Sequence, residues 1–275
     1  MRHPQWVRQL GGSPVVLVNP RAGACSRANV ARLAATLAVD DRALRTVGRD
    51  GSARALAAQA VRDRVPAVIV GGGDGTAHEV IQELAGTATA LGIVPLGTSN
   101  DLAADLGMPR DLALAFQVLA AGAQVSVDLL RTRSAWIATA GGLGLPARVA
   151  LRCNELREGH HRWWAGRMGS AIYAAVAAHQ ICWEPLPSAI YRVDVDGHRV
   201  TRAATAFLVS RVPRFGGLRL AEGSLVPRCF WAALISACDR RGLLAALARL
   251  RLGLPLGRRG VGPPGVHPAR GPARA

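Results

Sequence analysis

The sequence contains no lysine, so all 34 of its basic side chains are arginines. This absence excludes a Schiff-base mechanism and the lysine-containing phosphate loop of many nucleotide hydrolases. The 5 cysteines are scattered and never form a CxxC pair, which argues against a zinc site or a disulfide framework. No apolar run approaches the ~20 residues that cross a bilayer, and residues 1–9 do not read as a secretory signal. We therefore expect a cytoplasmic protein.

The formal net charge is +16, carried by arginine alone. A charge of this size favours an anionic partner, which could be a nucleotide, an acidic membrane surface or nucleic acid. Nucleic acid is the least expected of the three, because no aromatic residues are interleaved with the arginines and no nucleic-acid module is recognisable. Genome composition is an alternative explanation for the exclusive use of arginine. A peripheral contact with a membrane is thus one expectation among several.

The first half of the chain repeats one pattern: a short apolar run, a turn rich in glycine or asparagine, and a helical stretch. The apolar runs are Pro14 to Val18, Val68 to Val70 and Leu91 to Val94. Fully apolar strands that alternate with helices are typical of a parallel sheet covered on both faces. Each turn follows the carboxyl end of a strand, the edge at which such sheets bind ligands. The pattern predicts an α/β domain with a parallel sheet and a ligand site at this edge.

The second half predicts a mostly antiparallel β-rich domain. One helix is expected from about Gly166 to Gln180 and another over Gly242 to Leu252, and Asp196-Gly197 is a strong hairpin signal. Strands are expected at 125–130, 135–140, 189–195 and 199–210. The Gly-, Pro- and Arg-rich end of the chain predicts disorder. The expected organisation is an α/β domain at 1–124, a β-rich domain at 125–256 and a disordered tail at 257–275.

A glycine-rich loop, Gly71 to Thr76, follows the second apolar run and opens a helix. Because glycine has no Cβ, its backbone N–H groups can close on a phosphate, and the helix N-terminus adds the positive end of a dipole. The loop fits neither GxxxxGK[ST] nor GxGxxG. Asp74 within it is distinctive, since phosphates repel a carboxylate unless it binds a metal or accepts a proton. The alternative is a tight turn in which Asp74 caps the helix.

Two more loops sit at equivalent strand ends: Asn19-Pro20-Arg21-Ala22-Gly23 and Leu96-Gly97-Thr98-Ser99-Asn100-Asp101. Their Asn19, Thr98 and Asn100 side chains could hydrogen-bond a nucleotide. Three loops at one edge of a sheet favour a binding site more strongly than one loop does.

Together these motifs resemble the diacylglycerol kinase catalytic-domain family, which includes sphingosine kinases and bacterial lipid kinases. The resemblance rests on Asn19 to Gly23, on Gly72 to Thr76 with Glu79 one turn later, and on Pro95 to Asp101, in the family's order and spacing. It implies a nucleotide-binding α/β domain followed by a β-rich domain. It also implies an ATP- and Mg²⁺-dependent kinase that phosphorylates a hydroxyl of diacylglycerol or a related lipid.

The resemblance also assigns residues, with Asp74 as the catalytic residue and the metal ligands left unspecified. Supporting positions would be Glu79, Gly97, Asn100 and Asp101. The residues expected to contact ATP are Asn19, Pro20, Arg21, Ala22, Gly23, Thr46, Gly72, Gly73, Asp74, Gly75, Thr76, Ala77, His78 and Thr98. Trp163 and Trp164 would suit a lipid interface, with burial in the core as the alternative.

Two family motifs are absent. Active members carry Leu-Asp-Asp-Gly where this chain reads Leu225 to Arg228, and the late Asp-Gly-Glu is missing. Asp74 could replace the lost proton acceptor, or the chain could be a catalytically impaired member that binds ATP as a regulatory module. An ending altered after about Gly257 would also explain the missing motif. An NAD kinase, which shares a GGDG loop, is less expected because Pro95 to Asp101 matches the lipid branch better.

Overall fold

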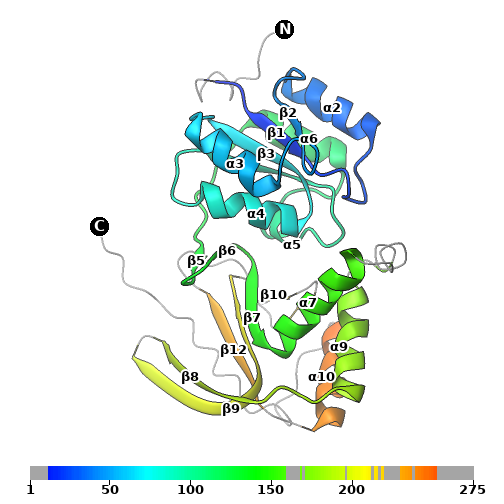
Figure 1. Ribbon diagram of the computed structural model, residues 1–275, viewed down its shortest axis with the longest axis vertical. Helices are drawn as coiled ribbons and strands as arrows, with labels where there is room; N and C mark the ends of the chain where they lie inside the picture. The colour runs from blue at the N-terminus through cyan, green and yellow to red at the C-terminus, as the bar shows by residue number, and fades with distance from the viewer. Residues whose placement is uncertain are drawn as a thin grey trace. The chain divides into compact units, whose positions relative to one another are not determined.

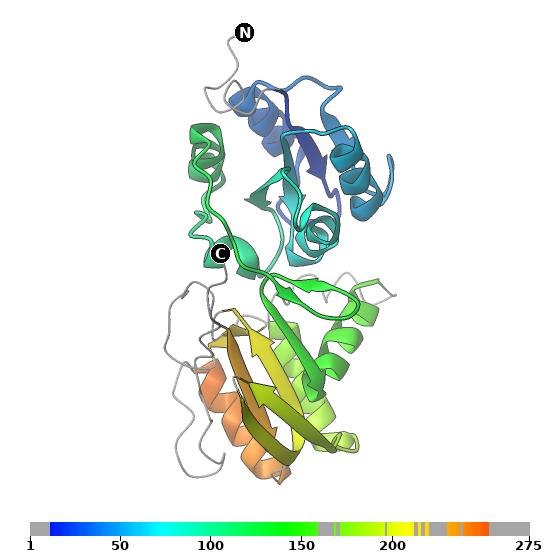
Figure 2. The same cartoon turned by 90° about the vertical axis from the view of Figure 1, so that its left-hand side faces the viewer.

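The computed structural model describes residues 12–158, 168, 171–195, 197–211, 214–215, 218–219, 230–236 and 239–252. Its internal contacts divide the chain into two units, Met1–Ala138 and Thr139–Ala275 (Figures 1 and 2). Trp163 and Trp164, the segment from Leu225 to Arg228 and the tail at 257–275 lie outside the described residues.

The first unit is built on a parallel four-stranded sheet in the order β2-β1-β3-β4. Its strands are β1 (Val15–Val18), β2 (Leu44–Thr46), β3 (Ala67–Gly72) and β4 (Ala90–Pro95). Every residue of β3 is buried, as expected for a strand covered on both faces. The predicted parallel α/β fold is confirmed.

Alternate residues of the strands pack into two hydrophobic cores, one on each face of this sheet. Val16, Ile69 and Val94 pack with residues of α2 (Arg27–Leu37) and α6 (Leu112–Ala121). Leu17, Val68 and Val70 pack with α3 (Ala53–Arg62) and α4 (Asp74–Leu84). The short helix α5 (Asp101–Asp105) follows β4. This layering places the loops after β1, β3 and β4 at one edge of the sheet.

In the first unit, side-chain caps begin helices α2, α3 and α6 but not α4. The hydroxyls of Ser26 and Ser52 and the carboxylate of Asp111 accept backbone N–H groups in the first turns of α2, α3 and α6, at 2.9–3.1 Å. Such caps supply acceptors for N–H groups that have no partner within the helix. The N-cap of α4 is Gly73, which has no side chain, so no side-chain cap is present there.

A short antiparallel pair, β5 (Leu130–Arg131) and β6 (Trp136–Ile137), completes the first unit. The prediction of a strand at 125–130 is therefore wrong except at Leu130, where β5 begins. Val125 is 76% exposed, and within this stretch Leu129, near its end, packs against a buried cluster. The stretch expected at 135–140 divides between β6 and the next strand.

The second unit holds an antiparallel sheet in which β9 (His198–Ser210) pairs with three partners, as predicted for this half of the chain. The partners are β7 (Ala140–Gly144), β8 (Ala189–Val195) and β12 (Trp231–Ser236). Gly197, in the turn between β8 and β9, has φ of 81°, a conformation that favours glycine. A separate pair is formed by β10 (Arg214–Phe215) and β11 (Leu218–Arg219).

In the part of this unit that the structure describes, three helices accompany the sheet: α7 (Leu145–Glu158), α9 (Ala171–Trp183) and α10 (Arg240–Arg251). Helix α9 packs against both of the others (Figure 1). The sequence analysis missed α7, whose many charged residues obscure an apolar stripe of Leu145, Val149, Cys153 and Leu156. Within the described part of the chain, no helix is both long and apolar enough to cross a membrane.

Candidate nucleotide site

The strand order identifies where a ligand would bind in the first unit. From β1 the chain passes to β2 on one side, and β3 then returns to the other side of β1. The β1/β3 pair is therefore the topological switch point, the place where open α/β sheets bind ligands beyond their carboxyl ends. The loops from Asn19 and from Gly72 both start at this point.

Asn19 ties these two loops together. Its backbone N–H donates to the Gly71 carbonyl at 2.8 Å, and its side-chain amide donates to Thr76 Oγ1 at 2.8 Å. Its amide oxygen accepts the backbone N–H of Arg21 at 2.9 Å. Asn19 thus orients its own loop and the first turn of α4 at the same time. A nucleotide contact by Asn19 would have to share these bonds or replace them.

The loop after β4 approaches the glycine-rich loop backbone to backbone. The N–H groups of Leu96 and Gly97 both donate to the Gly72 carbonyl, at 3.1 and 3.2 Å. A Cβ added to Gly97 would lie 2.3 Å from Gly73 Cα, well inside contact distance. Two glycines are therefore required where these loops meet.

Asn100 holds the shape of the third loop. Its Oδ1 accepts the N–H of Gly97 at 2.9 Å, and its Nδ2 donates to the Gly97 carbonyl at 2.8 Å. Its backbone is left-handed, with φ of 50° and ψ of 43°, which asparagine tolerates better than most residues. Asn100 acts here on the protein backbone, and Thr98 beside it is exposed.

Asp74 is half-buried, and its Oδ1 accepts the backbone N–H of Leu102 at 3.0 Å. The carboxylate therefore holds the first turn of α5, a neighbouring helix, instead of capping the helix that it opens. Gly75, next along, is exposed, and a Cβ added to it would meet nothing within 4 Å. The start of α4 is thus free of a side-chain cap and has open space beside it, as an anion site requires.

The remaining sequence-predicted residues differ in accessibility. Ala77 is 1% exposed and packs in the core, so only its backbone could serve a ligand. Thr46 ends β2, on the other side of β1, and Asp101 lies in the first turn of α5. The exposed residues among them are Pro20, Arg21, Gly23, Gly75, His78, Glu79 and Thr98. The half-buried residues are Asn19, Ala22, Thr46, Gly73, Asp74, Gly97, Asn100 and Asp101.

The sequence analysis overlooked Gln82, one turn beyond His78 on α4. Its amide donates to the Trp136 carbonyl at 2.9 Å and accepts the Trp136 N–H at 2.8 Å, as a neighbouring strand would. It also donates to the His78 carbonyl at 3.1 Å. Gln82 therefore fixes β6 to the helix that the glycine-rich loop begins. A glutamine on a helix carries no sequence signal for such a contact.

Asp50, in the loop after β2, was also overlooked. Its Oδ2 accepts the N–H of Thr46 at 2.6 Å, and Arg49 donates to Oδ1 at 2.9 Å. The pKa of Asp50 is held below its usual value mainly by the hydrogen bond from Arg49, and also by the hydrogen bond from the Thr46 N–H. The carboxylate closes the loop that follows Thr46, a predicted ATP contact.

The described residues contain no group of three or more His, Cys, Asp or Glu side chains that could enclose a metal ion. Mg²⁺ in phosphoryl-transfer sites usually needs only one or two carboxylates, the substrate phosphates and water. Asp74, whose Oδ1 is held at the start of α4 by the Leu102 N–H, fits that limited requirement.

A glycine-rich, uncapped helix start at the switch point of a parallel α/β sheet is an arrangement that many domains use to bind phosphate-bearing ligands. Residues 13–132 match the family model of the diacylglycerol kinase catalytic domain. The resemblance to this family seen in the sequence is therefore confirmed over residues 13–132.

Curated relatives agree with the family. A diacylglycerol kinase of Mycobacterium tuberculosis is 36% identical over 158 residues, which is 55% of this chain and 48% of that protein. A probable lipid kinase, YegS-like, of Klebsiella pneumoniae is 40% identical over 116 residues, 41% of this chain and 39% of that protein. The matches thus span less than half of these relatives.

Solved structures agree with the fold over more of the chain. A diacylglycerol kinase from Bacillus anthracis has a TM-score of 0.59 at 18% identity, covering 85% of this chain and 76% of that one. Another structure from the same organism, proposed to be a diacylglycerol kinase, has a TM-score of 0.64 at 18% identity, covering 86% and 79%. At this identity the likeness establishes the fold alone.

Proposed function

We propose that this protein is an ATP- and Mg²⁺-dependent kinase that phosphorylates a hydroxyl group of diacylglycerol or a related lipid. The observation that carries the proposal is the contact between Gly73 and Gly97 at the carboxyl edge of the sheet, beside the uncapped start of α4. The family's lipid-kinase relatives support a lipid as the acceptor.

In this proposal the phosphates of ATP bind the backbone N–H groups at the start of α4, where the helix dipole favours negative charge. Asn19 keeps that first turn aligned with its own loop through its bond to Thr76. Because the chain has no lysine, these N–H groups and Arg21 would provide the positive potential. Mg²⁺ bound to the phosphates would offset charge on the transferred group, and Asp74 would be its protein ligand only if that carboxylate is not the proton acceptor.

Asp74 is proposed to accept the proton of the lipid hydroxyl while that oxygen attacks the γ-phosphorus. The bond between the γ-phosphorus and the β,γ-bridging oxygen breaks, and ADP leaves with that oxygen. The Leu102 N–H holds Oδ1 of the carboxylate in place, which leaves Oδ2 for the proton. Such a base contributes about 10²- to 10⁴-fold to a rate.

The test is transfer of labelled phosphate from ATP to diacylglycerol in mixed micelles, with NAD as a competing acceptor. Asp74→Asn keeps the oxygen that accepts from Leu102 but loses basicity, so transfer should fall about 10²-fold or more at an unchanged melting temperature. Asp41→Asn, which alters an exposed carboxylate of the same unit, is the matched control.

Calorimetry of ATP binding tests whether the site binds a nucleotide at all, which both the kinase proposal and the alternative of an ATP-binding regulatory module require. A folded sample with no affinity for any nucleotide contradicts the proposal. ATP binding without transfer to any lipid contradicts the kinase reaction while leaving the nucleotide site intact, and transfer to NAD instead of lipid contradicts the choice of substrate.

A further inference from the structure

Strands β8 and β9 form a two-stranded ribbon that runs beyond the rest of the antiparallel sheet (Figure 1). Between Ala204 and Ser210, β9 is paired with β7 and β12, whereas its first residues are paired with β8. Ala204 pairs both with Ala189 of β8 and with Ser236 of β12, so these two strands lie on opposite sides of β9. Within the described part of the chain, the edge of β8 that faces away from β9 has no strand beside it.

This open edge has the features of a strand that can pair with another strand. β8 is 7 residues long, contains no proline and keeps a regular register with β9 throughout. Ile190 is 72% exposed and Val200 of β9 is 40% exposed, so the ribbon also presents apolar surface. An unpaired edge offers backbone N–H and C=O groups to a further strand, and charged side chains are the usual deterrent. The charges that β8 carries therefore decide what can pair with it.

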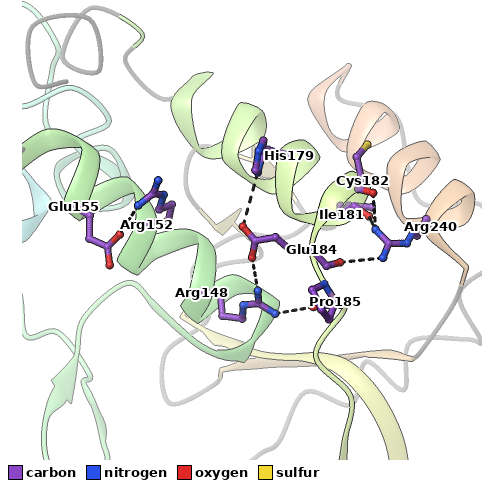
Figure 3. Close-up of polar contacts among 9 residues, drawn as sticks. All are labelled: Arg148, Arg152, Glu155, His179, Ile181, Cys182, Glu184, Pro185 and Arg240. Carbon is purple, nitrogen blue, oxygen red and sulfur yellow. Dashed lines mark hydrogen bonds and ion pairs between the residues drawn. The ribbon is translucent and has the colours of Figure 1, made fainter. Parts of the chain in front are cut away.

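The ribbon is held firmly where the chain enters it. At the end of α9, Arg148 of α7 donates to the Pro185 carbonyl at 2.8 Å and forms an ion pair with Glu184 (Figure 3). Arg240 of α10 donates to the Glu184 carbonyl at 3.0 Å (Figure 3). The other strand, β9, continues into the body of the sheet, where Ala204 is fully buried. A strand supported at both ends loses little entropy when it pairs.

The hairpin turn determines which backbone groups of β8 face the open edge. Two residues separate Val195 from His198, which pair directly with each other, and Gly197 between them has φ of 81°. In such a hairpin the residues that flank the turn exchange both hydrogen bonds, and hydrogen-bonded pairs alternate along the ribbon from there. The backbone N–H and C=O groups of Arg192 and Asp194 therefore point away from β9.

Arg192 and Asp194 carry opposite charges on the same face of the ribbon, and both are exposed. Arg192 forms no ion pair or hydrogen bond with any residue that the structure describes. Asp194 accepts from Arg199 through Oδ2 alone, at 3.1 and 3.3 Å, which leaves Oδ1 for a second cation. One free cation and one half-occupied carboxylate, two residues apart on an open edge, complement a second copy of the same strand.

We propose that two copies of this chain pair β8 to β8 in antiparallel fashion, around a two-fold axis at Val193. In this register, Arg192 of each copy lies directly opposite Asp194 of the other, and each such pair exchanges two backbone hydrogen bonds. An axis at Arg192 or at Asp194 instead brings like charges face to face, which destabilises a strand pair. The charges thus select one register, and the contact has the self-complementary form of a two-fold interface.

The opposite face of the ribbon gains an apolar row in the same arrangement. Val193 is half-buried and lies directly opposite Val200 in the hairpin. Pairing at the axis places the Val193 side chains of the two copies next to each other, with a Val200 on each side. β-branched side chains that line up across strands in this way stabilise a sheet. The two antiparallel sheets become one continuous sheet.

The first test is sedimentation velocity of the full chain, which should be a dimer. Arg192→Asp and Asp194→Arg each place like charges opposite one another twice, so each variant should raise the dimer dissociation constant about tenfold or more. Mixing the two variants should restore the dimer, because every opposed pair in the mixed dimer is again of opposite charge. The matched controls are Arg32→Asp and Asp41→Arg, which make the same charge changes at exposed positions of the first unit.

The second test is a disulfide at the axis. Opposed residues without mutual hydrogen bonds have Cα atoms about 4.5 Å apart in an antiparallel pair, within the range that a disulfide spans. Val193→Cys should therefore give a covalent dimer on a non-reducing gel under mild oxidation. Val200→Cys should not, since the two Val200 positions are three strand spacings, about 14 Å, apart. The unmodified chain shows what the native cysteines contribute.

An unmodified chain that stays monomeric at its highest soluble concentration overturns the proposal. So does a dimer that persists in Arg192→Asp and Asp194→Arg and gives no covalent link through Val193→Cys, because another surface then holds it. Equal weakening by the two control variants would show an effect of net charge, and failure of the mixed variants to form a dimer would contradict the register. None of these outcomes depends on phosphate transfer, so they are independent of the kinase proposal.

Discussion

Replacing Gly97 by alanine tests the central geometric feature of the candidate site. The added Cβ would lie 2.3 Å from Gly73 Cα, 2.8 Å from Asn100 Oδ1 and 3.1 Å from Gly73 N. Carbon atoms in contact are normally about 3.5 Å apart or more. The two loops must therefore separate by about 1 Å, because two of the three close atoms are backbone atoms that cannot rotate away.

Overpacking of this kind costs about 1–3 kcal/mol. For a protein of this size each kcal/mol corresponds to a fall of about 2–4 °C in melting temperature. Nucleotide affinity should fall as well, since a displacement of about 1 Å at a positioned site can cost on the order of 10²-fold. Calorimetric unfolding and titration with ATP measure the two effects on the same sample.

Gly75→Ala is the control that separates stability from binding. A Cβ at Gly75 meets no protein atom within 4 Å, so stability should stay constant or rise slightly. If phosphate lies against the start of α4, ATP affinity should nevertheless fall. An unchanged melting temperature for Gly97→Ala would refute the backbone contact, and unchanged ATP affinity for Gly75→Ala would refute the position assigned to the phosphates.

Three further predictions concern side chains around the site. Asn19→Ala removes the bond to Thr76 Oγ1 and should weaken ATP binding about fivefold, corresponding to ~1 kcal/mol for one hydrogen bond; unchanged affinity in calorimetry would contradict it. Gln82→Met removes both hydrogen bonds to Trp136 and should speed amide hydrogen exchange in β5 and β6. The free energy of unfolding should fall by about 1–3 kcal/mol, because the Trp136 N–H and carbonyl lose their partners. Asp50→Asn should lower the melting temperature at neutral pH, and the difference from the unmodified chain should shrink as pH falls below about 4.

The sign of the last prediction follows from the direction of the pKa shift. The folded-state pKa of Asp50 is below its unfolded value, because Arg49 and the Thr46 N–H stabilise the carboxylate. Its contribution is therefore present above the unfolded pKa and is lost as pH falls through the folded pKa. A melting-temperature difference that grew on acidification would contradict this reasoning.

Much of the first unit could be predicted because its signals are local. Short apolar runs, such as Val68 to Val70, read as buried parallel strands, and glycines at their carboxyl ends read as turns toward a ligand. The second unit was less predictable. Helix α7 carries mixed charges that hide its apolar stripe, and the alternation in polarity that starts at Val125 forms no strand before Leu130.

Within the site, the identity of the loops was readable from sequence, but the partners of their side chains were not. The sequence suggested that Asp74 either serves phosphate chemistry or caps its own helix. The fold shows that its Oδ1 instead accepts the N–H of Leu102 at the start of another helix, and its role in phosphate chemistry stays a prediction. Gln82 carried no signal at all, because its partner Trp136 lies 54 residues away. Asn19 was read as a ligand contact, and the fold engages it with Thr76.

The chain by itself determined which segments become strands of a parallel sheet, and that three turns rich in glycine and asparagine end them, since hydrophobic period and backbone freedom are local properties of residues. Only the tertiary structure decided that β3 and β4 bring Gly73 against Gly97 and that Arg240 of α10 fixes the end of α9. Such contacts depend on how elements distant in sequence pack together, and packing is a property of the whole fold.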